Sequence, residues 1–193
     1  TELLLALAGR FEECGLYLLA PWLPNLPQTD SMVKNRMDIA DFVPIRNYLF
    51  DDGKSASPAA PLDRIEAALA ADFVPKYAKK LLLGIPSFGI DYTQAAAGYR
   101  KRAVPAEQIC RTLAAPPDVH FDETTQTPFA VYTEDAYHCP VGHKLCYEDA
   151  RSLAAKLAVV EKNGLCGISI CSLAYDTPVL WQLLNQTYKV AKY

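Results

Sequence analysis

The sequence lacks any uninterrupted apolar run that approaches the roughly 18 residues of a membrane span, so we expect no membrane partner. Neither G-x-G-x-x-G nor G-x-x-x-x-G-K-[ST] occurs, and their absence removes the main sequence signals of dinucleotide-binding and P-loop folds. The sequence therefore predicts no nucleotide cofactor, and no pattern in it points to another cofactor.

Charge is also scarce. Charged residues make up 21% of the 193 residues and the net charge is −3, which gives no reason to expect a nucleic-acid partner. The basic residues are scattered apart from the run Arg100-Lys101-Arg102, which we interpret as a solvated loop rather than as a phosphate-binding patch. Hydrophobic residues, in contrast, make up 51% of the chain and predict a globular fold with a core.

Cysteine is more frequent than expected. Six cysteines are many for a reduced cytosolic domain of this size. Together with the sequon Asn185-Gln186-Thr187, they predict a secreted, extracellular protein with disulfides and a glycosylated Asn185. The chain starts at Thr1, directly in helical sequence and without a signal peptide, so we expect a processed or partial chain.

Hydrophobic periodicity predicts helices and strands that alternate along most of the chain. The predicted helices cover residues 2–13, 31–39, 62–73, 149–162 and 179–190. The predicted strands cover residues 16–20, 41–48, 80–86 and 164–176. This alternation is typical of parallel strands joined by helical crossovers, but a (β/α)8 barrel needs eight strands and the chain supplies four. We therefore expect half of a larger α/β structure.

One segment breaks the alternation. Residues 92–146 contain short extended pieces separated by turns at prolines, and we interpret them as an α+β insertion domain. The chain is thus divided into residues 1–91, with three strands and their helices, the insertion domain at 92–146, and a last helix-strand-helix unit at 147–193.

Several motifs resemble glycoside hydrolase family 18, the chitinases and chitinase-like proteins. The segments that resemble the family's sixth, seventh and eighth barrel strands are DFVPIRNY (41–48), KLLLGIPSFG (80–89) and GLCGISICSLAYD (164–176). Others resemble the loop after the sixth strand and the insertion domain: Ala60-Pro61-Leu62, AEQICRTL (106–113) and FDETTQTPFAVY (121–132). The resemblance implies the C-terminal half of a (β/α)8 TIM barrel, with the insertion domain between strands seven and eight.

The same resemblance implies a partner. The family's catalytic Asp-x-x-Asp-x-Asp-x-Glu strand belongs to the N-terminal half of the barrel, and that motif does not occur in this sequence. We expect the missing half-barrel to be a separate segment or chain, and we expect this chain to be unstable without it. No catalytic residue is assigned within residues 1–193.

At the expected sugar cleft, the resemblance implies a substantially altered pocket. Tyr48 matches the family's acetamido-binding Tyr, but Leu49 replaces the neighbouring Asp, and Arg46 replaces a Met. Phe88 stands in the place of a Tyr, and Cys171 replaces the Trp on which the sugar stacks. The expected ligand-binding residues of this degenerate cleft are Tyr48, Arg46, Asp51, Trp22, Phe88 and Cys171.

Three of these residues have alternative interpretations. An inward-pointing Arg46 needs a partner such as Asp51, and it forms either a structural ion pair that closes the cleft or a new anion site. Tyr48 is either a hydrogen-bonded core residue or an acetamido ligand. Trp22 either lines the cleft or packs in the core.

The segment 137–146 gathers potential metal ligands and cysteines. His138, Cys139, His143 and Cys146 are all zinc-ligand types, but their spacing fits no standard zinc finger, so we predict no metal and favour a Cys139–Cys146 disulfide across a turn. The resemblance gives Cys110 a partner beyond the eighth strand, where no cysteine occurs, so Cys110 pairs elsewhere or stays free.

Three functions remain open. The first is a non-catalytic, chitinase-like protein that binds a chitin or N-acetylglucosamine-type glycan, or a protein partner. The second is an active family 18 chitinase represented by its C-terminal half. The third is a structural or storage protein without a sugar site. The replacements at Leu49 and Cys171 favour the first.

Overall fold

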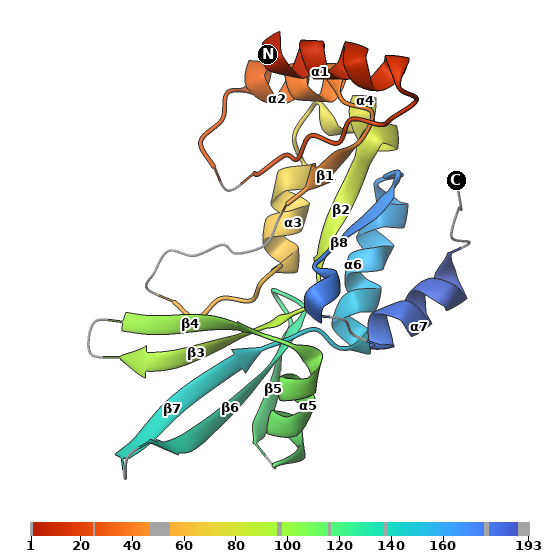
Figure 1. Cartoon of the computed structure of the whole chain (residues 1–193). Coiled ribbons are helices and arrows are strands. Elements are labelled where there is room, and N and C mark those ends of the chain that lie inside the picture. Colours follow the sequence, from red (N-terminus) through yellow and green to blue (C-terminus); the bar gives the residue numbers. More distant parts are fainter. Residues whose placement is uncertain are drawn as a thin grey trace.

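The computed structural model describes residues 2–24, 26–46, 55–95, 98–115, 117–136, 139–175 and 178–188 (Figure 1). The α-helices are α1 (Glu2–Glu13), α2 (Asp30–Ile39), α3 (Leu62–Leu69), α4 (Val74–Tyr77), α5 (Ala106–Ala114), α6 (Ala150–Lys162) and α7 (Pro178–Thr187). Two 3-10 helices are η1 (Ala78–Lys80) and η2 (Leu173–Tyr175). The strands are β1 (Val43–Ile45), β2 (Leu81–Pro86), β3 (Gly89–Ala95), β4 (Gly98–Val104), β5 (Asp118–Asp122), β6 (Thr127–Ala136), β7 (Cys139–Cys146) and β8 (Gly167–Cys171).

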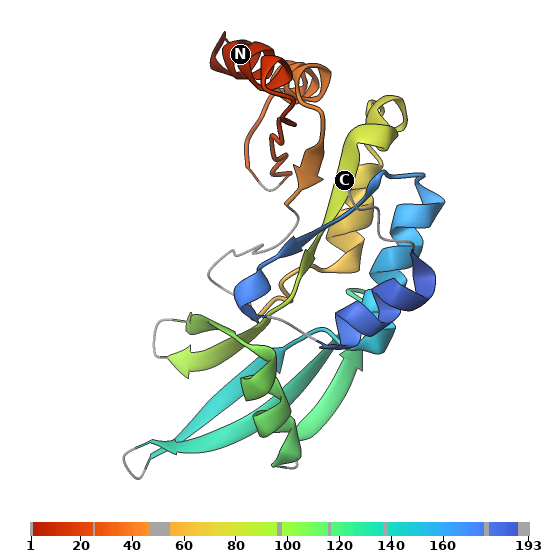
Figure 2. The same cartoon turned by 45° about the vertical axis from the view of Figure 1, so that its right-hand side comes forward.

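A parallel sheet is one of the two sheets of this mixed α/β fold. Its strand order is β1-β2-β8, and Leu83 of the central strand is opposite Ile45 on one side and Ile168 on the other. Isolated parallel bridges from Leu19 and Trp22 extend the β1 edge. We call these three strands the parallel sheet. Helices α3, α6 and α7 lie next to one another along it, as Figures 1 and 2 show.

Local sequence explains the elements that frame the parallel sheet. The run LLLGIP makes β2 a fully apolar strand, and Leu81, Leu83 and Ile85 have no exposed surface. Helix α6 starts at a capping box, in which Asp149 accepts from the Ser152 backbone N–H and Ser152 accepts from that of Asp149. These interactions fix the helix that leads back into β8.

The antiparallel sheet consists of β3 to β7 in the order β4-β3-β7-β6-β5. Helix α5 covers one of its faces, where Ile109 and Leu113 pack on Val104, Ala130 and Leu145. The sheet interrupts the chain between β2 and β8 and lies at the opposite end of the molecule from α1 and α2 (Figure 2). This arrangement agrees with an α+β insertion, whereas the exact domain boundaries at 91 and 147 stay predictions.

Gly89 permits the close approach of β3 and β7, two neighbouring strands of the antiparallel sheet. It is the first residue of β3 and lies beside Cys146, the last residue of β7. A Cβ atom at this position would come within 2.9 Å of the Cys146 carbonyl oxygen. Only glycine fits there without a shift of the backbone, so the chain enters and leaves the antiparallel sheet at one point.

The run Arg100-Lys101-Arg102 corrects one prediction. It lies within β4 and not in a loop, because the whole segment pairs with β3, including Asp91 opposite Arg102. All three side chains are exposed, although successive side chains point to opposite faces of the sheet, because β4 is an edge strand.

The two sheets are not closed into a barrel. Every residue of β8 is partly exposed, and among the described residues no strand pairs with its outer edge. None of the helices within the described ranges is long and apolar enough to cross a membrane.

Candidate functional site

The carboxyl ends of β2 and β8 meet at Ser87, where the parallel sheet faces the antiparallel sheet. The Ser87 backbone N–H donates to the Cys171 carbonyl oxygen at 2.8 Å, and its hydroxyl donates to the Ser172 carbonyl oxygen at 2.6 Å. In parallel α/β folds, ligands bind at the carboxyl ends of the strands. We therefore take this edge as the candidate site.

Two of the predicted cleft residues come together here. Phe88, which is buried, and Cys171, which is half-buried, belong to one apolar cluster with Tyr92 and Cys146. Tyr175 of η2 packs at a tilt on Phe88, with 5.8 Å between the ring centroids. The site is thus an aromatic wall, with a small thiol where the resemblance places a Trp.

Trp22 lies elsewhere. Its side chain is buried in the core of the parallel sheet, and its ring meets the edge of Phe73 at a centroid distance of 5.4 Å. Its backbone N–H donates to the Pro44 carbonyl oxygen, which holds the segment against β1. This position favours the packing interpretation of Trp22 over the cleft-lining one.

Arg46 is the residue that follows β1. Its backbone N–H donates to the Trp22 carbonyl oxygen at 2.8 Å, and its side chain is exposed. Tyr48, Leu49 and Asp51 lie outside the described residues, so the proposed Arg46–Asp51 pair stays a prediction. Asn185 is exposed on α7, which leaves its side chain accessible for the predicted glycosylation.

The predicted Cys139–Cys146 disulfide is wrong. Both residues lie on β7 at its two ends, and all six cysteines, including Cys110 and Cys14, are free. Seven steps along a strand separate their Cα atoms by roughly 23 Å, whereas a disulfide needs about 4.4 to 6.8 Å. The segment forms a strand instead of a turn because β7 pairs with β6 along its whole length.

The metal interpretation of this segment has no support in the described residues, which contain no group of three or more potential ligands. His138 lies outside them. His143 is instead held by Asp91, whose two carboxylate oxygens lie 3.1 Å from its Nδ1. Cys146 is buried, and desolvation raises the pKa of its thiol to about 11, so it remains protonated at neutral pH.

Sequence reasoning missed a buried ion pair at the start of α6. Lys156 has no exposed surface, and its Nζ donates to Glu148 Oε2 at 2.8 Å, where the Ser152 hydroxyl also donates at 2.7 Å. Burial raises the pKa of the Glu148 carboxyl, and the interaction with Lys156 opposes that shift. The four-residue spacing of Glu148, Ser152 and Lys156 is a helical-face signal that could have revealed the group.

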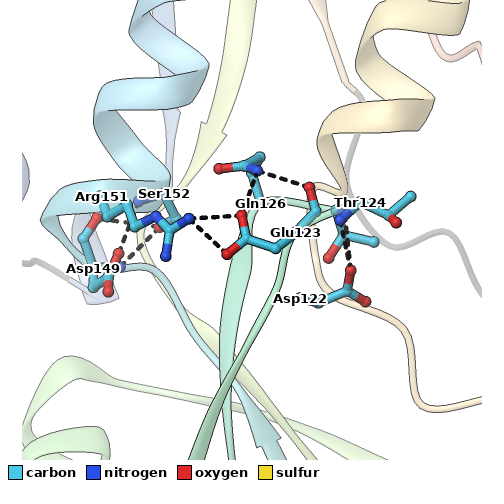
Figure 3. Close-up of polar contacts among 8 residues, drawn as sticks. Asp122, Glu123, Thr124, Gln126, Asp149, Arg151 and Ser152 are labelled. Atoms are coloured by element: carbon cyan, nitrogen blue, oxygen red, sulfur yellow. Dashed lines mark hydrogen bonds and ion pairs between the residues drawn. The ribbon is translucent and has the colours of Figure 1, made fainter.

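A second polar contact joins the sheets at the surface (Figure 3). The Arg151 guanidinium donates to both carboxylate oxygens of Glu123, at 2.8 and 2.6 Å, and lies 3.6 Å over the Phe121 ring. The hairpin that carries Glu123 also accepts a hydrogen bond from Leu62 N–H through the Thr125 carbonyl oxygen. The turn between β5 and β6 is therefore fixed against α3 and α6, which holds the antiparallel sheet beside the candidate site.

The decisive comparison is with protein families. The profile described as Glycosyl hydrolases family 18 matches residues 1–176. The chain belongs to glycoside hydrolase family 18. The family resemblance seen in the sequence motifs is thereby confirmed.

Curated relatives and solved structures of the family extend this result. The chain is 33% identical over 163 residues to the cortical fragment-lytic enzyme of Bacillus subtilis (strain 168), an alignment covering 80% of the chain and 36% of that enzyme. The spore cortex-lytic enzyme SleL of Bacillus megaterium superposes with a TM-score of 0.81 at 23% identity, over 98% of the chain and 45% of SleL. A chitinase from Chromobacterium violaceum superposes with a TM-score of 0.75 at 22% identity, over 95% of the chain and 59% of the chitinase. The family 18 chain thus spans less than two thirds of these relatives.

Proposed function

We propose that the chain is the C-terminal half of a family 18 (β/α)8 barrel and that a second segment or chain supplies the N-terminal half. Three features support this proposal. The strands β1, β2 and β8 are parallel, the outer edge of β8 is unpaired in the described residues, and the structural relatives are roughly twice as long. The exposed Leu3 and Leu5 of α1 fit a surface that the missing half covers.

The substrate of the complete barrel is the glycan of spore-cortex peptidoglycan, and the reaction is hydrolysis of its glycosidic bonds. The single observation that carries this assignment is the 33% identity to the Bacillus subtilis cortical fragment-lytic enzyme over most of the chain. In family 18 chemistry the acid Glu belongs to the other half of the barrel. The present half contributes the wall of the cleft at Phe88, Tyr175 and Cys171.

A second candidate is a protein that binds the same glycan without cleaving it. Cys171 favours this function, because a thiol offers far less surface for stacking against a sugar than the Trp that the family resemblance places there. An extracellular location rests on the cysteine count and the sequon at Asn185 and stays a prediction, as does binding of chitin.

The test uses the complete protein with two substrates, purified cortical fragments and chitooligosaccharides. We expect new reducing ends from the cortical fragments and few from the chitooligosaccharides. Retained binding of cortical fragments without any reducing ends would reject hydrolysis in favour of the second candidate. Absence of both binding and turnover would reject the whole assignment.

The Cys171→Trp variant tests whether residue 171 lies at the sugar site, with Cys171→Ser as its control. If Cys171 stands at the floor of the sugar site, a Trp there adds stacking surface and raises glycan affinity, whereas Ser leaves it nearly unchanged. Equal affinities of both variants would show that residue 171 does not contact the sugar.

A further inference from the structure

A groove of about 870 Å³ lies on the antiparallel sheet, apart from the candidate cleft. Its wall is one face of α5, with Glu107, Arg111 and Thr112, and its other side is β6 from Val131 to Glu134. Phe88, Ile90 and Tyr92 pack toward the parallel sheet, whereas Asp91 points to the opposite face, which α5 covers. The groove therefore lies on the far side of the sheet from the cleft.

Two of the residues that line the groove, Arg102 and Tyr132, contact a polar layer formed by Asp91 and His143. Asp91 is 2% exposed, and its carboxylate accepts a hydrogen bond from Arg102 Nη2 at 3.3 Å and also contacts His143. The Tyr132 ring stacks on His143 at 4.8 Å, and burial together with the nearby Asp91 carboxylate raises the pKa of its hydroxyl. Because these side chains hold one another, Arg102 and Tyr132 reach the groove in fixed orientations.

One side of the groove is an unpaired strand edge. Strand β5 pairs only with Thr127–Val131 of β6, and the last pair is Asp118 of β5 with Val131 of β6. Strand β6, however, continues to Ala136. Among the described residues, nothing pairs with this edge of β6 beyond Val131. An open edge offers backbone N–H and C=O groups that bind an extended peptide through main-chain hydrogen bonds.

The charges of the groove also suit a peptide. The lining carries two arginines, Arg102 and Arg111, and three acids, Glu107, Asp118 and Glu134, so it has a net charge of about −1 but carries both signs. Arg111 already donates to Glu107 at 2.6 Å, which leaves its other N–H groups for a ligand. A polyanion such as nucleic acid would be repelled by the acids. A peptide with a free carboxylate and an amine finds a partner for each.

We propose that this groove binds the stem peptide of peptidoglycan, the short peptide that branches from the glycan. The proposal rests on the proposed function, because only a peptidoglycan substrate brings a peptide together with the sugar. Arg111 and Arg102 receive the peptide carboxylate, Glu134 receives an amine, and the edge of β6 after Val131 receives the backbone. The antiparallel sheet thereby recognises the part of the substrate that chitin lacks.

The experiment measures hydrogen exchange in the complete protein with two probes, a synthetic stem tetrapeptide and the peptide-free disaccharide of N-acetylglucosamine and N-acetylmuramic acid. We expect the tetrapeptide to slow exchange in residues 132–136 and in α5, and the disaccharide to leave both unchanged. No slowing with the tetrapeptide, or equal slowing with the disaccharide, would overturn the proposal.

Charge reversal provides the matched comparison. Arg111→Glu should weaken tetrapeptide binding about tenfold, measured by calorimetry, because an ionic hydrogen bond becomes a repulsion. Arg64→Glu on α3 is the control, since Arg64 is also an exposed helical arginine beside an acid. Equal affinities of the two variants would also overturn the proposal. Turnover of peptide-free cortical glycan is assayed in parallel. Lack of this turnover would reject the proposed function, whereas the tetrapeptide measurements alone decide whether the groove binds the peptide.

Discussion

The parallel and antiparallel sheets differ in how many of their strand edges and faces are covered by the described residues. In the antiparallel sheet each of β3, β7 and β6 has neighbours on both sides, and α5 covers one face. In the parallel sheet, the strands within the described ranges give β8 a neighbour on one side only, and helix α1 buries none of its residues. One sheet is nearly complete within the described residues, whereas the other leaves the edge of β8 unpaired there, and α1 leaves Leu3 and Leu5 exposed, as the proposed missing half-barrel would require.

The largest expected effect is at the buried junction of the two sheets. Glu148 follows the antiparallel sheet directly, and Lys156 belongs to the helix that covers the parallel sheet. Lys156→Met leaves the Glu148 carboxylate buried without its cation and should cost about 3 to 5 kcal/mol in the free energy of unfolding. Urea denaturation of the complete protein measures this change in the free energy of unfolding. The Lys156→Met/Glu148→Leu double variant should recover much of the loss, and failure to recover would contradict the ion-pair explanation.

Truncation in the centre of the parallel sheet should come next. Leu83→Ala removes a fully buried side chain of the central strand and should cost about 2 to 5 kcal/mol, again by urea denaturation. Leu82→Ala is the control on the same strand, because Leu82 is partly exposed. A similar loss for both variants would mean that a companion segment buries the other face of β2 equally.

The pH dependence of stability should be smaller and has a definite sign. Burial raises the pKa of Glu148 in the folded state above its ordinary value of 4.5, so the folded protein binds this proton more tightly than the unfolded chain. The contribution is fully present below about pH 4.5 and is lost as pH rises through the folded pKa. Thermal unfolding at a series of pH values should show this decline in the wild type. The slope should be reduced in Glu148→Gln, and an unchanged slope would assign the pH dependence to another group.

The smallest effect on stability is expected at the exposed contact between Arg151 and Glu123. Arg151→Ala removes the contact with Glu123, but both side chains are more than half exposed, so the free energy of unfolding should change by no more than about 1 kcal/mol. Hydrogen exchange should nevertheless accelerate in the turn 123–126, because Arg151 also covers Phe121. Arg64→Ala serves as control, and acceleration in both variants would mean that the contact does not hold the turn.

Regular elements with strong local signals were predictable from sequence. Strand 80–86 and helix 149–162 agree with β2 and α6 within one residue, because an unbroken apolar run marks the strand and the helical spacing of apolar residues marks the helix. The predicted helix 62–73 ends earlier, at Leu69, and a separate short helix, α4, begins at Val74. Family membership was equally accessible from motifs in their chain order.

The antiparallel sheet was not predictable in detail, because its pairings join residues far apart in sequence. The turn predicted between Cys139 and Cys146 is instead part of β7, and Pro140 and Gly142 lie within this strand. Pro140 is tolerated there because β3 pairs with β7 only from His143 to Cys146, which leaves one side of Pro140 without a ladder. The Asp91–His143 contact, 52 positions apart in sequence, depends on the same pairing.

The close contact at Gly89 has a consequence for how such barrels diversify. The excursion from β2 to α6 begins and ends at neighbouring backbone positions, Ile90 opposite Cys146. Because the two ends already meet, this segment can be shortened, enlarged or exchanged between homologues as a cassette without altering the spacing of the strands beneath it. A graft that keeps Gly89 and the start of α6 should therefore transfer a different recognition surface onto an unchanged scaffold.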